Sequence, residues 1–171
     1  MEHKVQHYSR FMIVLHWLTA LCVGIAWLLS EGGPAVVRNP PTWHFMFGLA
    51  VLLLVVPRIG ARLAGGAPPL DAGSPPLLQL AAKVGHGVLY LFLIAMPLTG
   101  WYAASALGIP VTVFGVALPA LTDPVQPPPG FVAELHSTGG SVFLVIAGLH
   151  GLMALYHHFV LKDDTLRRMT L

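Results

Sequence analysis

Four long stretches of the chain contain no charged residue, and each is apolar along nearly its whole length. They lie between Arg10 and Glu31, between Arg38 and Arg58, between Lys83 and Asp123, and between Glu134 and Lys162. A helix that crosses a bilayer needs about 20 mostly apolar residues at a rise of about 1.5 Å each. The pattern therefore predicts four membrane-spanning helices, near residues 10–30, 42–63, 80–105 and 134–160.

The third uncharged stretch is too long for one span and too short for two spans with a loop. Gly108-Ile109-Pro110 ends its helix, because proline lacks the backbone N–H that a helix needs. We expect residues 111–121, which are apolar but interrupted by Gly115 and Pro119, to form a short segment at the membrane interface. The proline- and glycine-rich ranges 65–76 and 123–130 are expected to be connections.

Composition supports a membrane location for the whole chain. Of the 171 residues, 56% are apolar and 9% are charged, against about a quarter charged in ordinary soluble domains. A free-standing soluble domain is thereby excluded, and residues 1–171 are expected to form one all-α integral membrane domain, a four-helix bundle. The net charge of +2 and the lack of a basic tract interleaved with aromatic residues argue against nucleic acid as a partner.

The first apolar stretch is expected to remain as a permanent span rather than to be cleaved as a signal peptide. It runs from Phe11 to Leu29, which is longer than the apolar core of roughly 7–15 residues in a signal peptide. Lysine and arginine then set the orientation, since they are retained on the cytoplasmic side. A cytoplasmic N-terminus and C-terminus place eight of the nine basic residues inside and only Arg38 outside.

Six histidines fall within the predicted spans or near their ends, where a titratable side chain is costly and usually has a function or a partner. His16, His86 and His157 lie near the inner ends of three helices, His44 and His136 lie near the outer ends of two, and His150 lies deeper in the last. His136 and His150 are 14 residues apart, so they project from nearly the same face at depths roughly 21 Å apart.

Each of these two imidazoles needs a partner on another helix, and His44 is at the outer level while His16 lies toward the inner one. Two imidazoles on facing helices, with small residues such as Gly48 and Gly140 nearby, are typical of bis-histidine haem. The sequence has no Cys-x-x-Cys-His motif, so the haem would be b-type and non-covalent. Zinc is the other metal considered, but neither level plainly offers a third ligand.

The inner pairing is open on spacing alone. His157 is only about 20° away from the face of His150 and matches the depth of His16 better, and His86 lies at the same shallow level. For any one of these histidines, a hydrogen bond between helices is the alternative role. Arg10, Arg58 and Arg62 lie where they could reach the propionates of an inner haem or, alternatively, anchor the helices at the headgroups.

The order of motifs along the chain resembles the bacterial cytochrome b561 family of dihaem membrane cytochromes. The matching pieces are Tyr8-Ser9-Arg10, Leu15-His16-Trp17, His44 with Gly48, Arg58 to Arg62, Gly85-His86-Gly87, Met96-Pro97-Leu98-Thr99-Gly100, Phe114-Gly115 with Leu118-Pro119, His136, Gly148-Leu149-His150, His157-His158 and Lys162-Asp163. Together they span nearly the whole chain.

The resemblance implies two haems b, the outer one held by His44 and His136 and the inner one by His16 and His150. His86 and His157 match family positions that are not haem ligands, which suits a quinone site beside the inner haem. Members of the family are electron carriers, and one type oxidises superoxide on the outer side and passes the electron to ubiquinone. The implied function is thus a superoxide:quinone oxidoreductase of the bacterial inner membrane.

Two other functions are considered. Membrane subunits of formate dehydrogenases and hydrogenases resemble the same pattern, so the chain could instead be an anchor that relays electrons between quinone and a redox partner protein. A haem-free histidine-lined transporter is the third class. Superoxide is an anion, and the expected outer side has Arg38 as its single basic residue beside Glu31, Asp123 and Glu134, so electrostatic attraction there is weak.

Overall fold

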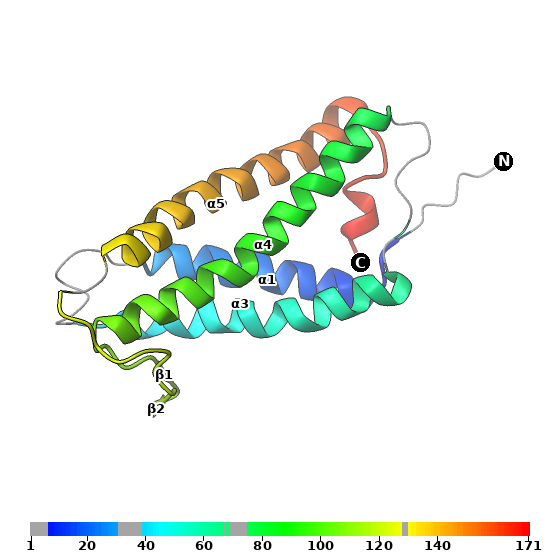
Figure 1. The fold of residues 1–171 in the computed structure, drawn as a ribbon. Helices are drawn as coiled ribbons and strands as arrows, with labels where there is room; N and C mark the ends of the chain where they lie inside the picture. The colour runs from blue at the N-terminus through cyan, green and yellow to red at the C-terminus, as the bar shows by residue number, and fades with distance from the viewer. Residues whose placement is uncertain (1–6, 31–38, 67, 69–74, 128–129) are drawn as a thin grey trace.

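Long helices run side by side in the computed structural model and form one bundle (Figure 1). The structure describes residues 7–30, 39–66, 68, 75–127 and 130–171. Within them the long helices are α1 (Arg10–Leu28), α3 (Thr42–Ala61), α4 (Pro76–Ala106) and α5 (Gly130–Tyr156). All four are long and apolar enough to cross a membrane. The predicted fold class, a membrane bundle of four helices, is confirmed.

Local sequence explains where these helices begin. The hydroxyl of Ser9 accepts the N–H of Met12 at 3.3 Å and caps α1. Two helices begin earlier than the sequence pattern suggested, α4 at Pro76 instead of near 80 and α5 at Gly130 instead of near 134. For α4 the reason is Pro75-Pro76, because proline suits the first helical position, whereas the pattern had placed the start by charge.

Helices α3 and α5 each continue into a π-helical turn, Arg62–Gly66 and His157–Leu161. The second turn ends at Lys162, whose φ of 56° is left-handed and stops the helix. A π-helical turn has more residues per turn than an α-helix. Side chains beyond Tyr156 therefore leave the register that the α-helical spacing predicts.

The centre of the bundle is an apolar core. Val51, Val55, Leu93 and Phe143 form a buried cluster contributed by α3, α4 and α5, and the rings of Phe92 and Phe143 stack with centroids 5.4 Å apart. This core separates the two ends of the bundle, and each end has its own group of histidines.

The outward faces of the helices are also apolar. Leu53 on α3 is 75% exposed and Val145 on α5 is 63% exposed, and many other large apolar side chains share this exposure. Contiguous apolar surface of this extent on a helical bundle is typical of contact with lipid acyl chains.

At one end of the bundle, α4 stops and the chain turns into a small hairpin. Gly108, which follows the end of α4, has a φ of 72°. Strands β1 (Thr112–Val113) and β2 (Val116–Ala117) then pair in antiparallel register, with Val113 opposite Val116. Sequence had predicted an interfacial segment here without a defined conformation, and the structure gives it a two-stranded hairpin beside the first turns of α3 (Figure 1).

The opposite end of the bundle carries the first described residues and the C-terminus together (Figure 1). The N–H of Tyr8 donates to the carbonyl of Arg168 at 3.0 Å, and the indole N–H of Trp17 donates to the carbonyl of Met169 at 2.9 Å. We refer to the two ends as the hairpin end and the terminus end. Three charged residues used in the orientation prediction, Lys4, Glu31 and Arg38, lie outside the described residues.

Candidate functional site

Two histidines face each other at the hairpin end. His44 lies in the first turn of α3 and His136 in the second turn of α5, and their ring centroids are 5.9 Å apart with planes at 89°. A metal ion bound by two imidazoles with metal–nitrogen distances of about 2 Å needs ring centroids roughly 6 Å apart. The spacing therefore suits one metal ion held between the two rings.

Backbone carbonyls orient both rings. Nδ1 of His44 donates to the carbonyl of Ala26 at 2.7 Å, and Nδ1 of His136 donates to the carbonyl of Met96 at 3.0 Å. A carbonyl can only accept, so Nδ1 carries the proton in both side chains and Nε2 keeps its lone pair. Metal-binding histidines commonly have this arrangement, because the second hydrogen bond fixes the tautomer and the ring orientation.

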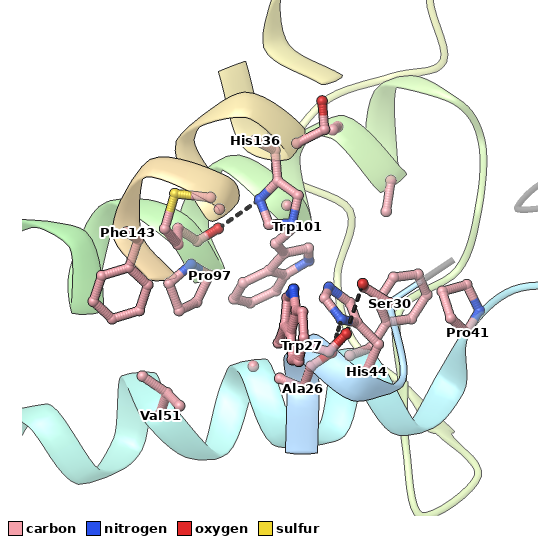
Figure 2. A pocket seen from close by; sticks show the side chains of 18 of the residues that line it. Ala26, Trp27, Ser30, Pro41, His44, Val51, Pro97, Trp101, His136 and Phe143 are labelled. Carbon is pink, nitrogen blue, oxygen red and sulfur yellow. Dashed lines mark hydrogen bonds between the residues drawn. The ribbon is translucent and has the colours of Figure 1, made fainter. Parts of the chain in front are cut away.

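A cavity of about 640 Å³ lies between these histidines, within the range of sites that hold large organic ligands. Figure 2 shows the His44 and His136 side chains on facing sides of it, and Trp101 and Pro97 are among the other residues that line it. The lining is mainly apolar. Nε1 of Trp101, a lining residue, is buried without a hydrogen-bond partner, so the cavity wall contains an unused donor.

Small residues keep the cavity open and let His136 approach α4. A Cβ atom on Gly100 would lie 2.7 Å from Cε1 of His136, closer than carbon atoms can pack, and one on Gly139 would lie 3.0 Å from the sulfur of Met96. A Cβ on Gly48, which lines the cavity, would meet open space. Gly48 thus leaves room for a ligand against the backbone, whereas Gly100 leaves room for the histidine.

A second group of histidines lies at the terminus end. The ring of His150 on α5 is 6.3 Å from that of His16 on α1 and 5.2 Å from that of His86 on α4, between centroids. Nδ1 of His86 donates to the carbonyl of Ala82 at 2.6 Å. Three helices therefore bring one imidazole each to this site, and spacing along the sequence had left open which of them meet.

Arginine and tyrosine side chains surround this second group. Arg58 is only 9% exposed, its Nη2 donates to Nδ1 of His16 at 2.7 Å, and its guanidinium lies 5.4 Å from the ring centroid of Tyr90. Arg62 lies 5.9 Å from the same ring. The Nε atom of Arg58 and the hydroxyl of Tyr90 are buried without hydrogen-bond partners. Such unused donors are suited to an acidic group of a ligand.

His157 does not join this group and instead pairs with Asp163. Its Nδ1 lies 2.5 Å from Oδ2 of Asp163, and Oδ1 of that carboxylate accepts the N–H of Thr165 at 2.9 Å. The spacing of seven residues from His150 had suggested a shared face, but at a rise of about 1.5 Å per residue His157 lies about 10.5 Å further along the helix, where a π-helical turn begins. Of the two candidates for the partner of His16, His150 is therefore the one that the fold brings next to it.

Asp163 lies outside the membrane-spanning segments, so its carboxyl group can ionise in contact with water. Partial burial would raise the pKa of this carboxyl, but hydrogen bonds from His157 and Thr165 outweigh that effect and hold the pKa below its ordinary value. The carboxylate is thus charged at neutral pH and fixes the chain that follows α5.

The structure separates the three arginines that the sequence grouped. Arg58 and Arg62 both approach Tyr90, whereas Arg10 is exposed at the first position of α1. Sequence reasoning missed the contact of Gly100 with His136, the position of Tyr90 beside Arg58, and the pairing of Asp163 with His157. Gly100 and Asp163 stood within recognised motifs, so a signal existed, but nothing in the sequence pointed to Tyr90.

The fold and the two histidine groups define a class of protein, the membrane-embedded helical cytochromes. Haem b is a flat, largely apolar macrocycle with two carboxylates, and it needs two imidazoles and an apolar slot. The hairpin end offers His44, His136 and the cavity beside Gly48, and the terminus end offers His16, His150 and unused donors on Arg58 and Tyr90. The residues present therefore fit the group.

Comparison with known proteins agrees with this class. The chain belongs to the prokaryotic cytochrome b561 family, whose model matches residues 7–171. It is 35% identical to a probable superoxide oxidase CybB of Yersinia pestis, over 95% of this chain and 94% of that protein. It is also 33% identical to cytochrome b561 homolog 2 of Escherichia coli K12 (96% and 91% covered) and 31% identical to cytochrome b562 of Cereibacter sphaeroides (95% and 94% covered).

Membership settles the general nature of the protein. Members of this family bind haem b and transfer electrons in the membrane. With four helices that can span a bilayer, the chain is a multi-pass protein of the bacterial inner membrane. The predicted family, membrane location and general electron-transfer function are confirmed.

Proposed function

We propose that the chain binds two haems b and transfers electrons from superoxide at the hairpin end to ubiquinone at the terminus end. The observation that carries the proposal is the presence of two histidine pairs, His44 with His136 and His16 with His150, at opposite ends of one bundle. When bound, haem b would supply one-electron redox chemistry, and these imidazoles would hold its iron.

His44 and His136 are ready to bind at the hairpin end, because both already donate Nδ1–H to carbonyls. His16 differs, since its Nδ1 accepts from Arg58 and its neutral ring then carries the proton on Nε2. Ligation through Nε2 requires the other tautomer. Arg58 would release His16 if a ligand carboxylate offered a stronger, charge-assisted acceptor, and its buried Nε already lacks a partner.

The proposed quinone site lies beside His150, where His86 places its ring. Nδ1 of His86 is held by the carbonyl of Ala82, which leaves Nε2 to accept or donate a hydrogen bond. Reduction of one quinone takes two electrons and two protons, while oxidation of one superoxide to dioxygen gives one electron, so two superoxide ions are consumed per quinol. The paired His157 and Asp163 are the proposed route for protons from the aqueous side.

Support for superoxide as the donor comes from the similarity to a probable superoxide oxidase. Electrostatic attraction is not part of the proposal, since Asp123 and Glu134 are exposed at the hairpin end and like charges repel the anion. Lower ionic strength is therefore expected to leave the rate of reduction by superoxide unchanged or to slow it.

The test uses the purified protein with its haem. We expect two haems per chain and a low-spin b-type spectrum that is reduced by enzymatically generated superoxide and reoxidised when a soluble ubiquinone analogue is added. Superoxide dismutase should abolish the reduction. Haems that stay oxidised with superoxide but are reduced by a co-purifying dehydrogenase or hydrogenase would contradict the proposal and favour the role of a membrane anchor subunit.

His86→Ala tests the quinone site separately. Reoxidation by the quinone should slow while reduction by superoxide and the haem content remain unchanged. His158→Ala is the matched control at the same end, because that ring packs on Phe159 rather than on His150. Equal reoxidation rates in both variants would contradict the assignment of His86.

A further inference from the structure

The hairpin formed by β1 and β2 presents an apolar tip to its surroundings. Phe114 is 85% exposed and Val116 is 67% exposed. From Lys83 to Asp123 the chain contains no charged residue, so the hairpin offers no charge to water. An exposed aromatic tip without charges is a patch that needs a partner.

The backbone of the turn holds Phe114 in this exposed position. Phe114 and Gly115 have φ values of 48° and 81°, which form a two-residue turn that usually contains asparagine and glycine. Phenylalanine rarely adopts a left-handed conformation. Pairing of Val113 with Val116 and the bond from the N–H of Leu118 to the carbonyl of Val111 hold the turn on both sides.

The hairpin is fixed rigidly to the bundle. Ile109 and Val111, just before β1, are buried with Ala104 of α4, and Phe45 and Leu49 of α3 pack on them. The N–H of Leu121, just after the hairpin, donates to the hydroxyl of Ser105 at 3.1 Å. The tip therefore cannot withdraw without disturbing the cavity between His44 and His136, which Ile109 and Val111 also line.

The surroundings of the hairpin identify the partner. The hairpin lies beside the first turns of α3 rather than over the end of the bundle (Figure 1). The helix ends at the same level carry the exposed aromatic side chains of Trp43 on α3 and Tyr102 on α4, and such residues gather at the headgroup level of a bilayer. The patch on the hairpin continues this aromatic belt.

We propose that the hairpin is an interfacial anchor whose tip, Phe114 and Val116, inserts among the lipid headgroups and upper acyl chains of the leaflet at the hairpin end. The occupant of the patch is phospholipid. Because the same segment supplies Ile109 and Val111 to the cavity wall, this contact fixes the depth of the histidine pair relative to the membrane surface. The inference is independent of the electron donor and of the quinone.

Photo-crosslinking in native membranes tests this directly. Phe114 is replaced by the photoreactive analogue p-benzoylphenylalanine, which keeps an aromatic ring in the turn, and the irradiated protein is analysed by mass spectrometry. We expect an added mass of one phospholipid. The same analogue at Val145, on the outward face of α5, is the positive control, and at Asp123, which is charged and exposed, it is the negative control.

Each other outcome overturns the inference. A crosslinked dimer of this chain or a covalent adduct with another protein would show that the patch is a protein interface. Absence of any adduct at position 114, with a lipid adduct at position 145, would show that the tip faces water. If the variant at position 114 does not accumulate, the analogue at Val116 provides the same measurement from the second exposed side chain of the tip.

Discussion

Gly100 shows how one missing side chain leaves room for a buried histidine. The residue lies in α4, directly against the ring of His136, which is held by the carbonyl of Met96 and approached by the hydroxyl of Thr99 at 3.3 Å. The ring therefore has little freedom to move away. Arg58 has a comparable role at the other end, where a buried guanidinium contacts both His16 and Tyr90.

Gly100→Ala is expected to displace His136 and to lower the haem content from the proposed two per chain to one. A Cβ atom at this position would lie 2.7 Å from Cε1 of His136, so the ring must shift and lose its alignment with His44. The pyridine haemochrome assay against protein concentration measures the loss. Gly87→Ala, on the same helix but with nothing within 4 Å of the added carbon, should keep both haems, and retention of two haems in Gly100→Ala would contradict the packing argument.

The irregular segments that follow α5 determine the contacts at the terminus end of the bundle. A π-helical turn begins at His157, whose ring pairs with Asp163, and the left-handed Lys162 ends this turn. The segment that follows then bonds to Tyr8 and Trp17 through backbone carbonyls. These hydrogen bonds hold the C-terminal residues against the terminus end, and Asp163 lies where this segment begins.

Asp163→Ala is expected to loosen this C-terminal segment and to increase hydrogen exchange of the amides in residues 163–170. The change removes the acceptor for His157 and for the N–H of Thr165. Asp164→Ala is the matched control, since among the described residues the side chain of Asp164 makes a longer contact of 3.4 Å with Arg167. In this variant the amides of residues 163–170 should exchange at the rate of the unmodified protein. Equal protection in both variants would show that Asp163 does not hold the segment.

The same carboxylate gives a pH dependence with a definite sign. Its pKa is lower in the folded protein than the ordinary value, so its stabilising contribution is fully present above about pH 4. The contribution is lost as the pH falls through the folded-state pKa. Because the Asp163 side chain is 37% exposed, this contribution to stability is small and is screened by salt. Protection of residues 163–170 from hydrogen exchange should fall only in acid.

The molecule as a whole is an asymmetric bundle with a hairpin at one end and, at the other, the first described residues together with the C-terminal segment. Helices α1 with α3 and α4 with α5 pack as neighbours around the central core, and the two histidine groups lie on either side of it. Transfer of electrons between opposite membrane surfaces needs such a division. The direction of the proposed transfer depends on which end faces the cytoplasm.

We expect the terminus end to face the cytoplasm, because all seven basic residues that the structure describes lie toward that end. A fluorescent protein fused after Leu171 should be fluorescent, and alkaline phosphatase inserted after Asp123 should be active, since that enzyme folds only outside the cytoplasm. The reversed reporters, phosphatase after Leu171 and fluorescent protein after Asp123, are the controls. An active phosphatase at Leu171 would mean that the bundle has the opposite orientation.

The sequence by itself determined the spans and the fold class, and it singled out the histidines that the proposed function uses. A bilayer admits only helices with long uncharged stretches, so the spacing of charges was enough to predict four spans, and the shared face of His136 and His150 followed from helical periodicity. The tertiary structure decided what depends on contacts between helices: Gly100 against His136, Tyr90 beside Arg58, and His157 paired with Asp163. Periodicity describes one regular helix, whereas a π-helical turn, an interhelical distance and a left-handed residue depend on the packing of several elements at once.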